Sequence, residues 1–458
     1  MQPKKRTLWG TRFGFYIAAI GSAFGLGNLW RFPYITAQSG GGAFVLLYVM
    51  MALAVGMPLL IGELMLGKLT RKTVIAGCRQ LGEGQANRNI AFNTWVGRLS
   101  VLVCLMAFSY YAVISGWVLH FLMQFSVGHL AHGNFDVDAS MKVLRDNGLL
   151  QIALTSVHLL ISLIIVVKGV QEGIEKWVSH IMPVFLILLI LLLTKALSLP
   201  TSTSALRFLF YPDFSTLTMQ SMLHALGHVL FTLSIGFGTM VTFGSYLNEK
   251  THIPSAGFRV TVMDTTISLI AGMLIFPLLV GTGVSSTGPE LLFQTMPQLL
   301  MNFEFGFFFG LAFYLCLYLA ALGASIGLLE SIVSNLIDFR QFTRIKSTWI
   351  SGGLALVISI PPALASTTFR SYNLGGRNLL EMIDGALVNW LLPIAALGVA
   401  LIASRRLKRE SMRNEFINDD SPATQKLFSH WLFVLRWIVP AIVILAMVLA
   451  LIGIIVEF

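Results

Sequence analysis

Long apolar runs alternate with short polar segments along all 458 residues of the chain. About 20 apolar residues in an α-helix cross ~30 Å of hydrocarbon, so each run of this length is predicted to span a membrane. The pattern predicts eleven spans, and no polar segment between them is long enough to form a soluble domain. The predicted spans are 12–36, 43–67, 91–126, 149–167, 174–196, 220–247, 259–282, 305–338, 348–365, 379–403 and 431–456.

Composition supports a single all-α membrane domain that covers residues 1–458. Apolar residues make up 56% of the chain and charged residues only 11%, whereas a soluble domain carries roughly 25% charged residues. The net charge of +10 lies mainly in short loops between the runs, which is typical of cytoplasmic loops and argues against a nucleic-acid partner. This distribution predicts a cytoplasmic N-terminus, and an odd number of spans then places Phe458 outside. Two long spans, 91–126 and 305–338, leave room for a re-entrant piece.

Two of the predicted spans are interrupted by glycine. The first contains Gly21, Gly25 and Gly27, and the sixth contains Gly236 and Gly238. Glycines this dense destabilise a helix, and broken helices at matching places in two halves are typical of transporters built from inverted repeats. We therefore expect a 5+5 arrangement with discontinuous spans 1 and 6. The two repeats are predicted at about 12–196 and 220–403, with an additional helix at about 431–456.

An unwound segment inside a membrane leaves backbone groups without partners, so it must line a cavity and bind something. The N–H groups of a half-helix attract a carboxylate, and freed carbonyls attract Na⁺ or an ammonium group. A zwitterionic amino acid satisfies both ends at once. The alternative is close helix packing, because Gly21 and Gly25 also form a Gly-x-x-x-Gly face. Asn28 and Arg31 in the same span favour the cavity.

Four sequence segments resemble the signature of the neurotransmitter:sodium symporter family. They are GLGNLWRFPY at 25–34, GGGAF at 40–44, FTLSIGFG at 231–238 and SY at 245–246. The resemblance extends from Arg6 to about Ala403. The eleven predicted spans are similar to those of bacterial amino-acid transporters of the family. The resemblance implies a secondary-active, sodium-coupled symporter that works by alternating access. A bacterial inner membrane is the expected location, because the chain is compact and carries no obvious organelle signal. An enzyme is not expected, because no nucleophile–base pair or phosphate-binding loop accompanies the glycines.

The resemblance also implies a substrate site between the two broken spans. The substrate carboxylate would meet the N–H groups of Leu26 and Gly27 and the Tyr111 hydroxyl. The amine would meet carbonyls of the broken spans and Ser234. The residues implied for the substrate site are Ala23, Leu26, Gly27, Ala107, Tyr111, Phe231, Thr232, Ser234, Phe237, Ala324 and Leu328.

Gly25 narrows the expected substrate class. Monoamine carriers of the family have an aspartate at this position, which pairs with the substrate amine. A glycine supplies no anion, so the substrate is expected to bring its own carboxylate, as an amino acid does. The small side chain of Ala107 suggests room for a hydrophobic or aromatic substrate side chain.

The first sodium site of the family maps onto the Ala23 carbonyl, Asn28, Thr232 and Asp264. Oxygen ligands suit a hard cation such as Na⁺, and a carboxylate within a membrane needs such a partner. Chloride-dependent relatives have a neutral residue in place of Asp264, and His228 stands where they have glutamine. Chloride independence is therefore predicted.

The second sodium site departs from the family pattern. The resemblance implies carbonyl ligands at Gly21, Phe24 and Ala320, but the two side-chain ligands are replaced by Gly323 and Ala324. Water or Ser325 would have to complete the shell. The alternatives are coupling to one sodium ion, or a proton in place of the second sodium, with His180 and His228 as titratable candidates.

The implied gates are pairs of opposite charge. Arg31 and Asp384 would close the outer side, with Tyr111 and Phe237 as an apolar lid. Arg6 and Asp338 would close the inner side, with Trp9 anchoring the N-terminal segment. Such pairs can alternate between made and broken states. Three further residues match the family: Glu63 is expected to brace span 6, and Gly173 with Pro183 marks a turn of span 5 that can unwind.

Three questions stay open at the level of sequence. A proton-coupled or single-sodium carrier is an alternative within transport, and a non-transporting amino-acid sensor is an alternative from another class. The sequence does not predict which amino acid is carried or what the oligomeric state is. No organic cofactor is expected.

Overall fold

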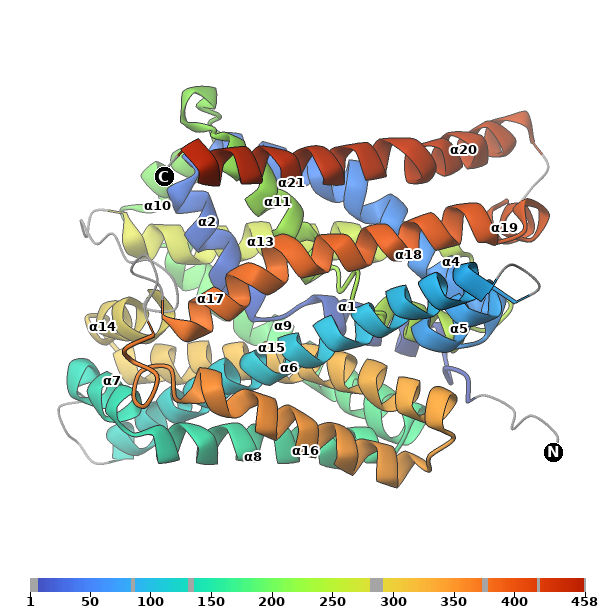
Figure 1. Cartoon of the computed structure of the whole chain (residues 1–458). Helices are drawn as coiled ribbons and strands as arrows, with labels where there is room; N and C mark the ends of the chain where they lie inside the picture. Colours follow the sequence, from blue (N-terminus) through green and yellow to red (C-terminus); the bar gives the residue numbers. More distant parts are fainter. Residues whose placement is uncertain are drawn as a thin grey trace.

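The chain forms a bundle of long helices that run roughly side by side (Figure 1). The computed structural model describes residues 7–83, 87–130, 136–280, 291–372, 378–417 and 421–456, and these described residues contain no β-strand. Residues 7–11, just before α1, lie at one end of the bundle and the end of α21 lies at the other (Figure 1). The helices are α1 (Arg12–Ala23), α2 (Phe32–Gln38), α3 (Gly42–Met51), α4 (Met57–Thr70), α5 (Val74–Gln80), α6 (Asn87–Leu130), α7 (Val137–Asp146), α8 (Gly148–Val167), α9 (Lys176–Leu197), α10 (Ser202–Phe210), α11 (Met219–Thr232), α12 (Thr239–Ser245), α13 (Ile253–Leu279), α14 (Met296–Met301), α15 (Gly306–Arg340), α16 (Arg344–Ala363), α17 (Leu379–Ala386), α18 (Leu392–Arg406), α19 (Arg409–Phe416), α20 (Pro422–Phe433) and α21 (Val439–Val456).

Several helices of the described residues contain a single wider turn of π-helix. Such turns are η1 (Gly27–Arg31), η2 (Ala52–Gly56), η3 (Val170–Glu175), η5 (Leu291–Thr295), η6 (Leu387–Leu391) and η7 (Val434–Ile438). One short 3₁₀ turn, η4 (Phe214–Thr216), precedes α11. Turns of π-helix are frequent at functional sites, and η1 and η3 both enter the argument below.

The helices follow the predicted spans closely. Eight helices of the described residues are long and apolar enough to cross a membrane, and a ninth span results if α1 and η1–α2 are counted together. The broken pair α11–α12 lies at the predicted sixth span and α16 at the ninth, but neither meets the same test of length and hydropathy. The count of eleven spans therefore stays a prediction, as do the boundaries of the two repeats.

The long spans 3 and 8 are continuous helices. They correspond to α6 and α15, and neither contains a re-entrant piece. The last span begins earlier than predicted, because α20 extends the helix back to Pro422, which occupies the first helical turn where proline is well tolerated. The predicted unwinding of span 5 is not seen in this structure, because η3 and α9 are helical from Val170 through Pro183.

Both predicted interruptions are present. The helix axis bends by 46° between residues 12–23 and 27–38, and residues 233–238 form a non-helical turn between α11 and α12. α15 packs along α6, α9 and α1, which brings the first interruption next to the middle of the bundle. α13 also packs against α1 and η1. Side chains from α6, α13 and α15 can therefore face the two breaks.

Candidate functional site

The two helix breaks lie against each other. The hydroxyl of Ser234 donates to the carbonyl oxygen of Ser22, with 3.0 Å between the oxygens. The Leu26 N–H, freed by the first break, donates to the Tyr111 hydroxyl at 2.8 Å. The Gly25 N–H donates to the Asn28 side-chain oxygen at 3.1 Å. Backbone groups without helical partners are thus satisfied by side chains from span 1 itself and from α6.

A cavity of about 20 Å³ lies between the two breaks. This volume holds about one water molecule, so an amino acid does not fit without a rearrangement. Two residues predicted for the substrate site, Leu26 and Ala107, are not part of the lining, and three others, Ser22, Gly25 and Asn28, join it. The lining residues are Ser22, Ala23, Gly25, Gly27, Asn28, Tyr111, Phe231, Thr232, Ser234, Phe237, Ala324 and Leu328.

Gly25 leaves space that another residue would fill. A Cβ atom at this position would lie 2.6 Å from the Tyr111 hydroxyl and 3.0 Å from the Cβ of Ala324. Even an alanine would crowd the cavity, and an aspartate would need more space still. In this conformation the cavity wall at Gly25 is therefore bare backbone.

Asp264 joins the two broken spans at the position implied for the first sodium site. Its carboxylate is 1% exposed and accepts from the Asn28 amide at 2.7 Å and from the Thr232 hydroxyl at 2.9 Å. Asn28 also donates to Ser268 at 2.9 Å, and Ser268 contacts the Tyr48 hydroxyl at 3.0 Å. These hydrogen-bond partners of Asp264 are neutral, so the negative charge is available to a cation.

The position implied for the second sodium site is closed by backbone. A Cβ on Gly323 would lie only 2.8 Å from the carbonyl oxygen of Gly21, so α15 approaches α1 directly at this point. Ser325 contacts the Nε2 atom of His158 at 2.8 Å. The hydroxyl that was expected to complete an ion shell is therefore paired with a histidine of α8.

The outer charge pair predicted from the resemblance is formed. One nitrogen of Arg31 lies 2.8 Å from each carboxylate oxygen of Asp384. The Tyr110 hydroxyl donates to the same carboxylate at 2.8 Å, and the Arg31 guanidinium lies 6.0 Å from the ring centre of Phe231. Tyr110 was not singled out from the sequence.

At the other end of the bundle, Trp9 is buried against the inner half of span 6. Its ring nitrogen donates to the Phe243 carbonyl at 3.1 Å, and its backbone N–H donates to the Tyr246 carbonyl at 3.0 Å. Asp338 accepts from the Thr73 N–H at 2.9 Å. Arg6, the predicted partner of Asp338, lies outside the described residues. We call this end the inner end, following the orientation predicted from the loop charges.

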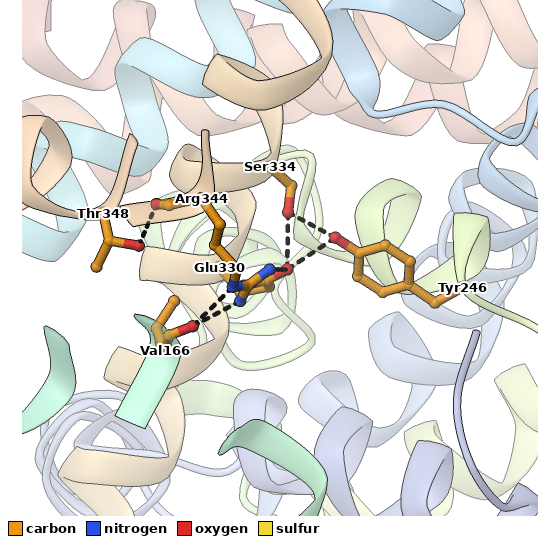
Figure 2. A network of polar contacts seen from close by, with 6 residues as sticks. All are labelled: Val166, Tyr246, Glu330, Ser334, Arg344 and Thr348. Carbon is orange, nitrogen blue, oxygen red and sulfur yellow. Dashed lines mark hydrogen bonds and ion pairs between the residues drawn. The ribbon is translucent and has the colours of Figure 1, made fainter. Parts of the chain in front are cut away.

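A polar network at the inner end was missed by the sequence reasoning (Figure 2). Glu330 is fully buried and accepts from Arg344 at 2.5 Å, from Tyr246 at 2.7 Å and from Ser334 at 2.7 Å. Arg344 also donates to the Val166 carbonyl at 2.7 and 2.9 Å. The network thus connects α8, α12, α15 and α16. The detectable signal was Glu330, a lone glutamate within an apolar span, followed by Arg344 at the start of the next helix.

A second, larger cavity opens beside this network. Its volume is about 700 Å³, and its lining includes Thr7, Val170, Tyr246, Asp338 and Arg344. The inner end therefore contains a large cavity, whereas the outer end is closed by the pair of Arg31 and Asp384.

Three of the histidines, two singled out from the sequence and one not, differ in their surroundings. His180 is exposed on the surface of α9, and its Nδ1 atom lies 2.7 Å from the Lys176 carbonyl. His228 is buried between the rings of Phe32 and Tyr48. His158, which the sequence reasoning did not consider, is buried beside Ser325. Only His228 lies close to the Asp264 cluster, through Tyr48.

Glu63 takes the position expected of it. The side chain is 2% exposed, and one carboxylate oxygen accepts from the Gly236 N–H at 2.7 Å. Glu63 thus holds the turn between α11 and α12 from α4, and the prediction that it braces span 6 is confirmed.

Comparison with known proteins places these features in a family. The family model described as the sodium:neurotransmitter symporter family matches residues 6–138 and 135–456. An uncharacterized sodium-dependent transporter of Bacillus subtilis, YhdH, is 33% identical over 457 residues, which is 99% of each chain. An uncharacterized sodium-dependent transporter of Haemophilus influenzae is 29% identical over 96% of this chain and 97% of its own.

A solved structure has the same fold. The crystal structure of MhsT in complex with L-phenylalanine superimposes with a TM-score of 0.88 at 30% sequence identity, and the alignment covers 97% of this chain and 100% of that chain. The likeness therefore extends over nearly the whole chain.

Proposed function

Because the chain belongs to the sodium:neurotransmitter symporter family, and is therefore a multi-pass membrane protein and a sodium-dependent transporter, we propose that it carries amino acids with hydrophobic or aromatic side chains. The proposed mechanism is symport with Na⁺ by alternating access, without a requirement for chloride. The proposed location is a bacterial inner membrane, with a cytoplasmic N-terminus.

The observation that carries this proposal is the arrangement of bare backbone around the central cavity. The Leu26 N–H and the Tyr111 hydroxyl lie side by side at 2.8 Å, and the hydroxyl keeps a hydrogen with which it can donate to a carboxylate. Gly25 contributes no anion to pair with an amine. A ligand that brings both a carboxylate and an ammonium group suits these surroundings. MhsT, the structural neighbour, binds one such ligand, L-phenylalanine.

Phe231 and Phe237 favour an apolar substrate side chain. Both line the cavity, and their ring centres lie 5.8 Å apart in an edge-to-face arrangement. Aromatic rings bind apolar and aromatic groups well in this geometry. The cavity must expand from about 20 Å³ to admit such a group, and movement of these two rings would create space.

Sodium is proposed to bind where Asp264 meets both broken spans. Na⁺ would take the place of the hydrogen bonds that Asn28 and Thr232 donate to the carboxylate, and their oxygen atoms would turn toward the ion. Asn28 lies in the same turn that presents the Leu26 N–H. Ion binding therefore orders the carboxylate site, and by linkage each ligand raises the affinity for the other.

The charge of Asp264 supports independence from chloride. The hydrogen-bond partners of this carboxylate are neutral, so a bound Na⁺ finds its countercharge within the protein. An additional anion would add a second negative charge beside a buried carboxylate, which is unfavourable.

The conformation of the gates fits one state of an alternating-access cycle. The Arg31–Asp384 pair closes the outer side at 2.8 Å, while the inner end contains the cavity of about 700 Å³. Substrate would enter from outside after Arg31 and Asp384 separate. It would leave through the inner cavity, whose lining includes Asp338 and Tyr246.

Uptake into proteoliposomes tests the proposal. Each common amino acid is supplied in labelled form with an inward Na⁺ gradient, with a K⁺ gradient in its place, and with gluconate in place of chloride. The expected result is accumulation of hydrophobic or aromatic amino acids that requires Na⁺ and persists in gluconate. Binding of labelled amino acid without any accumulation would support a sensor in place of a carrier.

One observation favours a second form of coupling. The contact between Gly323 and the Gly21 carbonyl leaves no side-chain ligand for a second sodium ion. A proton-coupled or single-sodium carrier is therefore the runner-up form of coupling. Reversal-potential measurements with separate Na⁺ and pH gradients distinguish them, because the potential at zero flux depends on the number of each ion carried.

A further inference from the structure

We propose that Glu175 is a positioning residue of the transport cycle: its carboxylate binds the N-terminus of α1 and holds the inner end of span 1 against span 5. This inference rests on the proposed alternating-access function, and it adds a contact at the inner end that lies apart from Asp338. Glu175 is the last residue of η3, the π-helical turn at the inner start of span 5.

The contact consists of three hydrogen bonds to two consecutive residues. One carboxylate oxygen accepts from the Gly10 N–H at 2.9 Å, and the other accepts from the Thr11 N–H at 3.1 Å and from the Thr11 hydroxyl at 2.7 Å. Thr11 is the N-cap of α1, and its hydroxyl accepts from the Gly14 N–H at 2.8 Å. A carboxylate at this place is favoured by the helix dipole and by charge-assisted hydrogen bonds.

Gly14 leaves the space that the carboxylate occupies. A Cβ atom built on Gly14 would overlap the carboxylate of Glu175. Any other residue at this position would displace Glu175 from the helix end. A second contact runs in parallel, because the Gln171 side chain donates to the Leu8 carbonyl at 2.8 Å. The first turn of span 5 therefore holds residues 8–11 at two separate points.

The location of the contact gives it a role in opening. Thr7 lies just before this segment and Val170 lies at the start of η3, and both line the cavity of about 700 Å³ at the inner end. If the inner end of span 1 moves away from span 5, the cavity widens between these two residues. The three hydrogen bonds of Glu175 must break in that movement. Glu175 therefore stabilises the narrower form of the inner cavity.

A thiol reporter in the inner cavity tests this role. Ala76 lines the cavity and is half-buried, while the three native cysteines are buried, so Ala76→Cys provides one accessible thiol. The rate of its reaction with a membrane-impermeant maleimide is measured from the inner side of oriented vesicles. The parent with Ala76 intact corrects for background labelling.

Glu175→Gln is the main variant, and Glu172→Gln is its matched control on the same turn. Glu172 is exposed, so its substitution removes an equal charge without touching α1. Loss of the charged acceptor at a partly exposed site is expected to raise the labelling rate about threefold to tenfold. Glu172→Gln is expected to leave the rate unchanged. Equal rates in Glu175→Gln and the parent would overturn the proposal.

Gly14→Ala provides an independent check, because it displaces the carboxylate without removing it. The same rise in rate is expected, and combining it with Glu175→Gln should add little more, since both changes disrupt one contact. Fully additive effects would contradict the proposal. Thermal unfolding of each variant in detergent establishes that the protein is folded before labelling.

The outcome is separable from that of the proposed function. In the parent, Na⁺ with a transported amino acid should change the labelling rate. If no amino acid does so, the transport proposal fails, while the comparison of Glu175→Gln with Glu172→Gln in ligand-free vesicles still decides whether Glu175 holds the inner end closed.

Discussion

The two broken spans are held open in different ways. In span 1 the interruption is short: α1 ends at Ala23 and helix resumes at Gly27 after a bend of 46°. Its freed N–H groups are bound by polar side chains, those of Asn28 and Tyr111. In span 6 the interruption covers residues 233–238 and depends on backbone conformation, because φ is positive at Ser234 (54°), Gly236 (84°) and Gly238 (72°).

The difference has a consequence for function. The side chains that hold the break in span 1 also line the central cavity, so in the proposed carrier they would both hold the break and bind the substrate. The turn in span 6 is set by glycine and by Glu63 from α4, which does not line the cavity. Changes to Asn28 and Tyr111 should therefore act mainly on binding, and changes to Gly236 and Glu63 mainly on folding.

The largest effect is expected where the two breaks are joined. Asp264→Ala removes the carboxylate that binds both Asn28 and Thr232. Sodium-dependent uptake should fall at least about a hundredfold, because a charged ligand to a buried cation is lost. The stabilisation of the purified protein by Na⁺ should disappear, which a thermal-shift assay measures.

Asp213→Ala is the control for this prediction, because Asp213 is exposed in the segment before α11. Uptake by that variant should match the parent. If Na⁺ still raises the melting temperature of Asp264→Ala, the ion binds elsewhere.

The next largest effect is a loss of stability, and it is expected from a substitution in the span 6 turn. Gly236→Ala places a side chain at a φ of +84°, with its Cβ 2.9 Å from the Leu392 carbonyl. The strain and the close contact together should lower the free energy of unfolding by about 3 kcal/mol. Gly385→Ala is the matched control, since a Cβ there meets nothing within 4 Å. A melting temperature unchanged by Gly236→Ala would contradict a turn that depends on backbone conformation.

The sequence predicted the two breaks because glycines inside an apolar run oppose a regular helix. It also predicted that Arg31 would meet Asp384, through the resemblance to the family. Glu63 was assigned correctly for the same reason. Each of these features depends on one residue type at one position of a recognisable motif, and such a position can be identified in a single sequence.

Other contacts could not be predicted, because they depend on where separate helices touch. The pairing of His158 with Ser325 joins α8 to α15, and neither position carries a local signal. Leu26 and Ala107 were expected in the cavity, but the lining excludes both. Glu330 of α15 pairs with Arg344 of α16, and Glu175 accepts from the Gly10 N–H, which lies 165 residues earlier in the chain. Such contacts require the packing, which the apolar pattern alone leaves undetermined.

A moderate effect is expected from Glu63→Gln. The change keeps the shape of the side chain and replaces the carboxyl acceptor of the Gly236 N–H by an amide oxygen. The free energy of unfolding should fall by about 1 kcal/mol, as for a typical buried hydrogen bond. Substrate affinity should change little, which isothermal titration in the presence of Na⁺ measures. A large loss of affinity with unchanged stability would reverse the contrast between the two spans.

A comparable effect on stability, with a clear effect on binding, is expected from Tyr111→Phe. The Leu26 N–H loses its partner at 2.8 Å, which should cost about 1 kcal/mol of stability, while the proposed carboxylate site loses a donor and its Kd rises about tenfold. Tyr110→Phe is the matched control, because that hydroxyl donates to Asp384 and not to the break in span 1. It should alter closure of the outer gate and leave the carboxylate site intact, so affinity measured from inner-side binding should stay near that of the parent. If both phenylalanine variants weaken binding equally, the hydroxyl of Tyr111 acts only through the outer gate, and the break in span 1 serves structure alone.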